Sequence, residues 1–188
     1  MTASILDMPE VRQRVSPLSV EDYHRLGEFN EKGRRTELIR GIVIEKMSKS
    51  PVHSTMVVLL YRLLLARVPK GFTVRQEQPL TLKDSEPEPD IAIVCGTERD
   101  FLDAHPGTAQ LVIEVALASA ALDRENASLY AEACVKEYWI VLGKEHQVEV
   151  YRRPENGRYQ EQFVAGPHGT IECLGLPGVQ IQVSDLLP

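Results

Sequence analysis

The amino-acid sequence predicts an α/β protein with a mixed core sheet, flanking helices and antiparallel C-terminal hairpins. Three observations predict this class. Short apolar runs rich in β-branched residues lie at 91–94, 110–115 and 138–142, which is typical of buried strands. Helical patterns at 51–68 and 119–133 accompany these runs. After Gly143, alternating segments are divided by Gly or Pro turns, which favours hairpins. This order of elements gives a mixed sheet flanked by helices.

The length and composition indicate one globular domain. The chain has 188 residues, of which 43% are hydrophobic and 26% are charged, an ordinary balance for a protein that buries its own core. Residues 1–17 are predicted to form an N-terminal lead-in, and residues 18–188 the domain itself.

The net charge of -6 argues mildly against constitutive nucleic-acid binding, because proteins that bind DNA usually carry a basic face. A cluster of carboxylates that holds a cation would also make the count negative, so binding is not excluded. The local basic residues are interpreted as solvated surface: Arg34, Arg35, Arg40, Lys46, Lys49, Arg152 and Arg153.

Neither the cysteines nor the apolar runs indicate a metal-thiolate site or a membrane span. Cys95, Cys134 and Cys173 are widely spaced without a zinc pattern, and the first two are expected to be small buried residues. The longest apolar run, 56–66, is too short to cross a bilayer, and residues 1–15 lack a signal-peptide core. We therefore expect a cytoplasmic protein with no membrane partner.

The N-terminal part predicts a helix followed by a hairpin. Ser19 and Asp22 form an S-x-x-D start signal, and Gly33 ends the helical pattern. Residues 37–47 are typical of a hairpin with Gly41 as its turn or bulge.

The central part predicts a helix from Pro51 to Val68, with proline tolerated at its first position. A strand follows at 72–76, and we expect Leu80 and Leu82 to continue it after Pro79.

A third helix is predicted from a Ser119 cap to about Ala133, with Leu122, Leu129, Tyr130 and Ala133 facing inward. The antiparallel tail is expected to comprise strands at 148–151, 159–164, 170–173 and 179–183.

Two acids stand out by their location. Asp90 opens the apolar run IAIV, and Glu114 lies inside the run LVIEV. A carboxylate in a core strand is costly unless it is paired, protonated or bound to a cation. A salt bridge would explain one such acid, whereas two on neighbouring strands favour a shared divalent cation. Spacing alone leaves both explanations open.

The segments that contain these acids resemble a known nuclease signature. "EPEPDIAIV" followed by "AQLVIEVA" is similar to the PD-(D/E)-x-K pattern. Together with "ELIRGIVIEKM", a helix-start His53, "DRENASLYAEACVKEYWIVL" and "VEVYRRP", they resemble a large bacterial family with the restriction endonuclease-like fold. The likeness covers about residues 18–187.

The resemblance implies a four- or five-stranded mixed core sheet and Mg²⁺- or Mn²⁺-dependent hydrolysis of phosphodiester bonds in DNA. It implies Asp90 and Glu114 as metal ligands, since hard carboxylate oxygens suit Mg²⁺. Glu37 matches a family acid on the hairpin and is a third candidate, although an exposed strand-edge carboxylate is an equal alternative. His53 and Gln78 also match family positions. Cutting two strands favours a two-fold homodimer.

The chain departs from the pattern at the lysine. Ala116 stands two residues after Glu114, where the signature has lysine, and Asn126 stands where the family helix supplies it, four residues before Tyr130. Asparagine carries no charge to stabilise a transition state. Arg124 is a possible substitute, although an ideal helix places it about 200° around from Asn126.

Three functions follow from these observations. The first is a metal-dependent DNA endonuclease in which Asp90, Glu114, Glu37 and Asn126 form the catalytic site. The second is a catalytically inactive nuclease-fold protein that binds nucleic acid or a partner. The third is a structural module whose acids are only salt-bridged.

Overall fold

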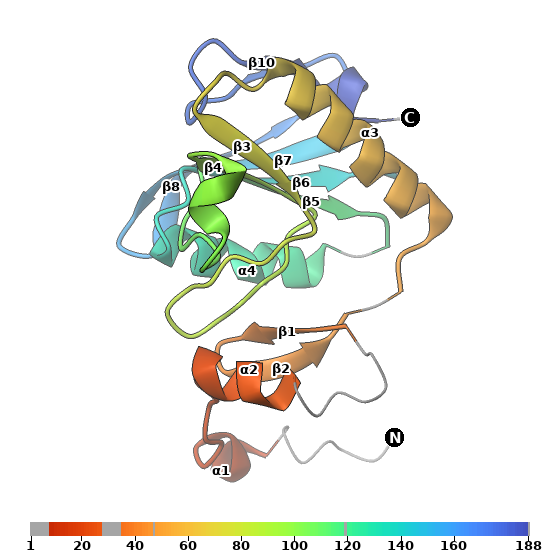
Figure 1. Cartoon of the computed structure of the whole chain (residues 1–188). Helices are drawn as coiled ribbons and strands as arrows, with labels where there is room; N and C mark the ends of the chain where they lie inside the picture. The colour runs from red at the N-terminus through yellow and green to blue at the C-terminus, as the bar shows by residue number, and fades with distance from the viewer. Residues whose placement is uncertain (1–7, 28–34, 47, 119, 188) are drawn as a thin grey trace. The chain divides into compact units, whose positions relative to one another are not determined.

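The computed structural model of the chain describes residues 8–27, 35–46, 48–118 and 120–187 (Figure 1). The chain forms two compact units: residues 1–46 with 84–86, and residues 47–83 with 87–188. Each unit is described by itself. The predicted boundary between a lead-in and a domain at residue 18 remains a prediction.

The first unit contains two short helices and a hairpin. Its elements are α1 (Pro9–Arg12), α2 (Val20–Gly27), β1 (Thr36–Ile39) and β2 (Ile42–Glu45). The predicted start signal forms, because Asp22 N–H donates to Ser19 Oγ at 3.1 Å and Ser19 N–H donates to Asp22 Oδ2 at 3.3 Å. The predicted helix end at Gly33 lies outside the described residues.

The hairpin turns through Arg40 and Gly41, which have φ angles of 53° and 74°. Two successive positive φ angles are required by a two-residue type I′ turn, whose twist matches that of the strands. Ile39 therefore pairs directly with Ile42. Residues 84–86 belong to this unit, since Glu86 N–H donates to Leu38 O at 2.7 Å.

The second unit is built on one mixed sheet of six strands in the order β3-β4-β5-β6-β7-β8. The strands are β3 (Phe72–Gln76), β4 (Ile91–Cys95), β5 (Leu111–Ala116), β6 (Glu137–Leu142), β7 (Gln147–Glu155) and β8 (Arg158–Ala165). Only β5 and β6 are parallel, and α4 (Ala121–Glu132) connects them. The predicted fold class is confirmed. The sheet exceeds the four or five strands implied by the resemblance, since β7 and β8 extend it instead of forming a separate tail.

The two faces of this sheet are covered differently (Figure 1). On one face, α3 (Pro51–Arg67) packs Met56, Val57, Leu60 and Leu64 into the main apolar core. The C-terminal elements join this core: β9 (Thr170–Glu172), β10 (Gln180–Gln182) and η3 (Val183–Leu186). On the other face, α4 contacts β6, β7 and β8 over a row of tyrosine rings, Tyr130, Tyr138, Tyr151 and Tyr159, with neighbouring centroids 4.8–6.1 Å apart.

Several local expectations were wrong. The strand β3 ends at Gln76, because Glu77 takes a φ of 51° and turns the chain, so Leu80 and Leu82 are buried in a connection. Leu122 is 47% exposed instead of inward-facing. Cys95 and Cys134 are exposed, and only Cys173 is buried. Ser119, the expected cap, lies outside the described residues.

Within the described ranges, no helix has the length and hydropathy needed to cross a bilayer.

Candidate active site

The structure brings Asp90 and Glu114 together at one end of the sheet. Asp90 directly precedes β4, Glu114 lies in β5, and the antiparallel register pairs Ile91 with Ile113. Asp90 N–H donates to Glu114 Oε2 at 3.1 Å, and Val115 N–H donates to Asp90 Oδ2 at 2.9 Å. Asp90 is buried and Glu114 is half-buried. The geometry predicted for two acids on neighbouring strands is therefore present.

A lysine contacts this acidic pair. Lys49 Nζ donates to Asp90 Oδ1 at 2.6 Å and to Glu77 Oε1 at 2.5 Å. Its side chain is only 16% exposed. The interpretation of Lys49 as solvated surface was therefore wrong, since two carboxylates hold it inside the second unit.

A histidine at the start of α3 completes the contacts of Asp90. His53 Nε2 lies 3.1 Å from Asp90 Oδ2. Ser50 caps α3 by accepting the His53 N–H at 3.2 Å, so the same helix start positions both Lys49 and His53. His53 Nδ1 is buried and has no hydrogen-bond partner among the described residues.

The charges at this site stabilise one another. Burial would raise the pKa of the Asp90 carboxyl, but the hydrogen bond from His53 and the charge of Lys49 outweigh it and hold the pKa below its ordinary value. Burial would lower the pKa of the Lys49 ammonium, whereas Asp90 and Glu77 raise it above its usual range. The pair is therefore ionised, a carboxylate beside an ammonium.

The helix α4 supports Glu114 from the other side. Tyr130 in α4 donates its hydroxyl hydrogen to Glu114 Oε1 at 3.1 Å. Asn126 lies four residues earlier, so the helical repeat places it on the same face, one turn towards the helix start. Asn126 is buried. The position where the family lysine was expected is thus on the helix face that approaches Glu114.

Glu37 and Gln78 are the two remaining predicted candidates. Glu37 is in β1 of the first unit, where its Oε2 lies 3.6 Å from Lys46 Nζ. Its membership in the acidic site stays a prediction. Gln78 is exposed just after β3.

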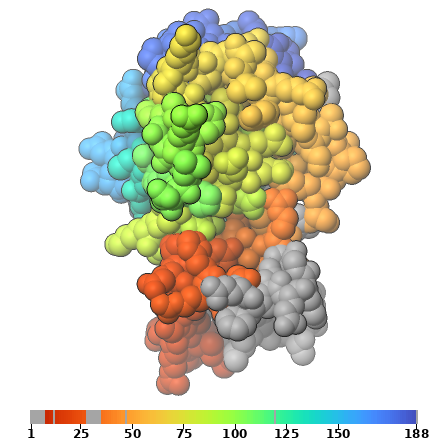
Figure 2. Space-filling view, in the orientation of Figure 1, coloured from red at the N-terminus to blue at the C-terminus, as the bar shows by residue number. Residues whose placement is uncertain are grey.

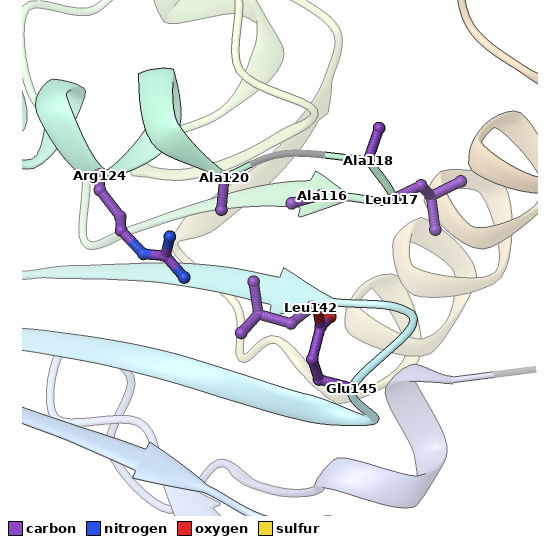
Figure 3. Close-up of a pocket in the computed structure, with 7 residues that line it drawn as sticks. All are labelled: Ala116, Leu117, Ala118, Ala120, Arg124, Leu142 and Glu145. Carbon is purple, nitrogen blue, oxygen red and sulfur yellow. The ribbon is translucent and has the colours of Figure 1, made fainter.

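Arg124 has its own partner. Its Nη2 lies 2.6 Å from Glu149 Oε1, and its Nε lies 3.0 Å and 3.1 Å from the two Glu149 oxygens. It reaches from α4 towards the strands and lines a cavity of about 260 Å³ with residues at the ends of β5 and β6 (Figure 3). This bidentate pairing commits Arg124 to Glu149 and leaves it a poor substitute for the missing lysine.

The donor set fits a hard divalent cation. Mg²⁺ is usually bound through one or two carboxylates together with water and substrate phosphates, and Asp90 and Glu114 supply two such groups. Within the described part of the chain, no three His, Cys, Asp or Glu side chains form a ready metal cage. A cation would therefore share Asp90 with Lys49 and complete its coordination with water or substrate.

The residues that the sequence did not identify are Lys49 and Glu77. A weak signal existed, because Lys49 and His53 flank a serine-proline helix start and bracket its first turn. Its meaning depends on where that helix start packs, which no local pattern reports.

The mixed six-stranded sheet with its flanking helices has a nuclease-like fold. The chain is similar to a solved structure described as "a putative nuclease belonging to DUF820 from Anabaena variabilis", with a TM-score of 0.76 and 20% identity over 90% of this chain and 97% of that chain. At this identity the likeness concerns the fold. No curated protein matches the chain. The family model "Uma2: Putative restriction endonuclease" matches residues 20–184, and the chain belongs to this family.

Proposed function

We propose that this protein is a metal-dependent DNA endonuclease that hydrolyses phosphodiester bonds at the Asp90–Glu114 site. The observation that carries the proposal is the contact between these two acids on neighbouring strands, beside a half-buried lysine. Membership of the Uma2 family and the nuclease-like fold support it.

In this proposal Asp90 and Glu114 hold Mg²⁺ or Mn²⁺. When bound, such an ion polarises a phosphate and lowers the pKa of a water. The chain's own residues orient the site. Tyr130 fixes one oxygen of Glu114, and the N–H groups of Asp90 and Val115 fix the two carboxylates against each other.

Lys49 supplies the positive charge that Ala116 and Asn126 lack. Its ammonium lies 2.6 Å from Asp90, and it comes from the start of α3 instead of from β5 or α4. A preorganised cation at this place would orient an attacking water and offset negative charge on the phosphate. This assignment gives Asn126 no charged role.

One observation favours the second candidate, an inactive nuclease-fold protein that binds nucleic acid or a partner. Lys49 already neutralises Asp90, and a metal ion would compete with that ion pair. If the pair is tighter than metal binding, the fold retains its shape without cleaving.

A plasmid-nicking assay with Mg²⁺ or Mn²⁺ tests the proposal. Wild type should nick the plasmid, and Asp90→Asn and Glu114→Gln should not. Glu149→Gln is a matched control, because Glu149 is also a buried, ion-paired strand carboxylate, and it should retain activity.

Calorimetric titration with Mn²⁺ separates the two candidate functions. An inactive protein that binds no metal would contradict the endonuclease proposal. An RNA substrate of the same sequence tests whether DNA is preferred.

The proposal includes a cytoplasmic two-fold dimer, since two scissile strands need two sites. One stripe of α3 supports it, because Val52 and Leu59 lie two helical turns apart on the same side and are about half-exposed, and exposed apolar residues that gather on one face mark interaction sites. Light scattering should report a dimer at micromolar concentration, and Leu59→Glu should shift it to monomer. A monomeric wild type would contradict this part.

A further inference from the structure

The second unit contains a buried arginine that lacks an acidic partner. Arg75 in β3 is only 6% exposed. Its Nη2 contacts His105 Nδ1 at 3.0 Å and Pro79 O at 3.4 Å, and its guanidinium carbon lies 5.2 Å from the centre of the Phe101 ring. Among the described residues, no ion pair joins Arg75 to a carboxylate, and its buried Nε has no hydrogen-bond partner.

This arrangement is costly unless something else neutralises the charge. A buried charge without a partner is strongly unfavourable in a protein. Burial lowers the pKa of Arg75, but a guanidinium stays protonated in proteins. The contacts from Phe101, His105 and Pro79 position the group without neutralising it, because none of them is an anion.

Arg75 borders a cavity. Arg75 lines a hollow of about 240 Å³ together with Thr73, Gln78, Phe101, His105 and Tyr61. The segment around η2 (Glu98–Phe101, green) lies beside β3 (yellow) in Figures 1 and 2. Glu98 also lines the cavity, but its side chain is exposed and no ion pair ties it to Arg75. The cavity thus offers a fixed cation, neighbouring polar side chains and one exposed carboxylate at the surface.

The sheet register relates this cavity to the acidic site. Arg75 pairs with Ala92, and Asp90 lies two residues before Ala92. Because side chains alternate along a strand, Arg75 and the Asp90 position share one face of the sheet. Strand dimensions put their Cα atoms about 8 Å apart. Consecutive phosphates of a nucleic-acid strand lie farther apart through space than the axial rise of about 3.4 Å per nucleotide, so this separation corresponds to one or two nucleotides.

We infer that the Arg75 cavity binds a phosphate group of the nucleic-acid strand, one or two nucleotides from the bond at Asp90. This rests on the proposed function only in naming nucleic acid as the source of the phosphate. Arginine suits the task, since its planar fork matches phosphate oxygens. Glu98 would oppose the ligand by charge, which gives the site two residues with opposite expected effects.

Binding measured without divalent metal tests this site independently of cleavage. Fluorescence anisotropy with a short labelled DNA duplex in chelator would compare wild type with Arg75→Met, Arg75→Lys and Glu98→Gln. Arg75→Met should weaken binding on the order of tenfold, as expected for a lost charged hydrogen bond. It should also reduce the salt-dependence slope by about 0.9. Arg75→Lys should keep the slope but lose part of the affinity, and Glu98→Gln should tighten binding.

Inorganic phosphate provides the second arm, with thermal stabilisation as its readout. One outcome is that phosphate stabilises wild type but not Arg75→Met, while the two proteins bind the DNA duplex with equal affinity. In that case the cavity binds a free phosphate compound, and the inference that it binds a phosphate of the DNA strand is wrong. If neither ligand distinguishes Arg75→Met from wild type, the inference is overturned. Circular dichroism confirms that each variant folds. If the protein binds DNA in an Arg75-dependent manner but does not cleave it, the proposed function is contradicted and the phosphate site is supported.

Discussion

Two buried acids on the same sheet, Asp90 and Glu137, are held in different ways. Glu137 at the start of β6 is fully buried, with Oε1 2.9 Å from Arg152 Nε and 2.7 Å from Leu174 N. Its Oε2 accepts from Trp139 Nε1 at 3.1 Å. These donors are fixed by the backbone or by packing, since Arg152 also stacks over the Phe163 ring at 5.0 Å. Both carboxylate oxygens of Glu137 are therefore occupied by fixed donors.

Asp90 accepts from one fixed backbone donor, the N–H of Val115, and from the side chain of Lys49. Lys49 is a flexible chain that also pairs with Glu77, whose side chain is 27% exposed. A lysine ammonium is a point charge on a mobile stem, whereas a stacked guanidinium is rigid. The comparison teaches that burial of an acid alone does not mark a reactive site. The two acids differ instead in the kind of donor around them, a lysine for Asp90 and a stacked arginine for Glu137.

The largest expected effect concerns stability. Glu137→Ala should lower the free energy of unfolding by about 3–5 kcal/mol. It removes the acceptor of Trp139 Nε1 and of Leu174 N–H, and it leaves Arg152 with only a longer ion-pair contact of 3.8 Å to the partly exposed Glu161. Asp90→Ala should cost only about 1–3 kcal/mol, since Lys49 keeps Glu77 as a partner. Urea unfolding of both variants measures the difference. Equal losses would mean that Asp90 is a structural acid like Glu137.

The next effect concerns rate. Lys49→Met should lower the cleavage rate by about 10²–10³, the usual cost of losing one preorganised transition-state donor. Its Mn²⁺ affinity, measured by calorimetry, should stay equal or rise, because Asp90 loses a competing cation. Lys136→Met, at an exposed lysine before β6, is the control and should match wild type. A loss of metal binding in Lys49→Met would assign Lys49 a structural role.

Stabilisation by a bound metal should depend on Asp90 and not on Glu137. Saturation at 100 times the dissociation constant stabilises a protein by about 2.7 kcal/mol, which for this chain length raises Tm by about 5–10 °C. Mn²⁺ should produce this shift in wild type and in Glu137→Gln, and Asp90→Asn should abolish it. Calorimetric melting in chelator and in Mn²⁺ measures it. A shift that survives in Asp90→Asn would place the metal elsewhere.

The pH dependence of stability compares Glu137 with a third buried acid, Glu149. Burial raises the pKa of Glu137 above its ordinary value of 4.5, so its stabilising contribution is present below pH 4.5 and is lost as pH rises through the raised pKa. The hydrogen bond from Arg124 lowers the pKa of Glu149, so its contribution is present above pH 4.5 and is lost as pH falls through the lowered pKa.

Glu137→Gln should therefore become less destabilising as pH rises above 4.5, whereas Glu149→Gln should become less destabilising as pH falls below it. Urea midpoints from pH 3.5 to 7 test this. Parallel curves for the two variants would show that the two carboxyls share one environment.

The fold class and the pairing of Asp90 with Glu114 could be predicted from the sequence, because both depend on local patterns of apolar and polar residues. Asp90 and Glu114 lie in contiguous apolar runs, and adjacent strands bring such runs together. Lys49 and Asp90 are 41 residues apart, and their contact depends on how the start of α3 packs. Sequence reasoning classed both Lys49 and Arg152 as surface, although their partners bury them.

Asp90 was selected because it is an acid next to an apolar run, and this rule also selects acids that form structural ion pairs. Glu149 lies in the alternating segment VEVY and Glu137 opens the strand EYWIVL, so both are acids beside apolar residues. Their cationic partners come from other elements of the chain, α4 for Glu149 and β7 for Glu137. Only the three-dimensional arrangement separates a closed ion pair from a site with an exchangeable cation.

The smallest expected effect is at Asn126, where the family lysine is absent. If Lys49 already supplies the cation, Asn126→Lys in wild type should change the cleavage rate by less than about tenfold, because the two ammonium groups would act on the same carboxylates and their effects would not add. In the Lys49→Met background the same substitution should recover at least about tenfold of the lost rate, since Asn126 shares the helix face of Tyr130, which contacts Glu114.

Asn126→Met in each background is the control, because it has similar length and no charge. A large gain from Asn126→Lys in wild type, with no dependence on Lys49, would show that Lys49 is not the catalytic cation. The ion pair at Asp90 would then belong with Glu137, as a structural contact, and the difference between the two acids would lie in metal binding alone.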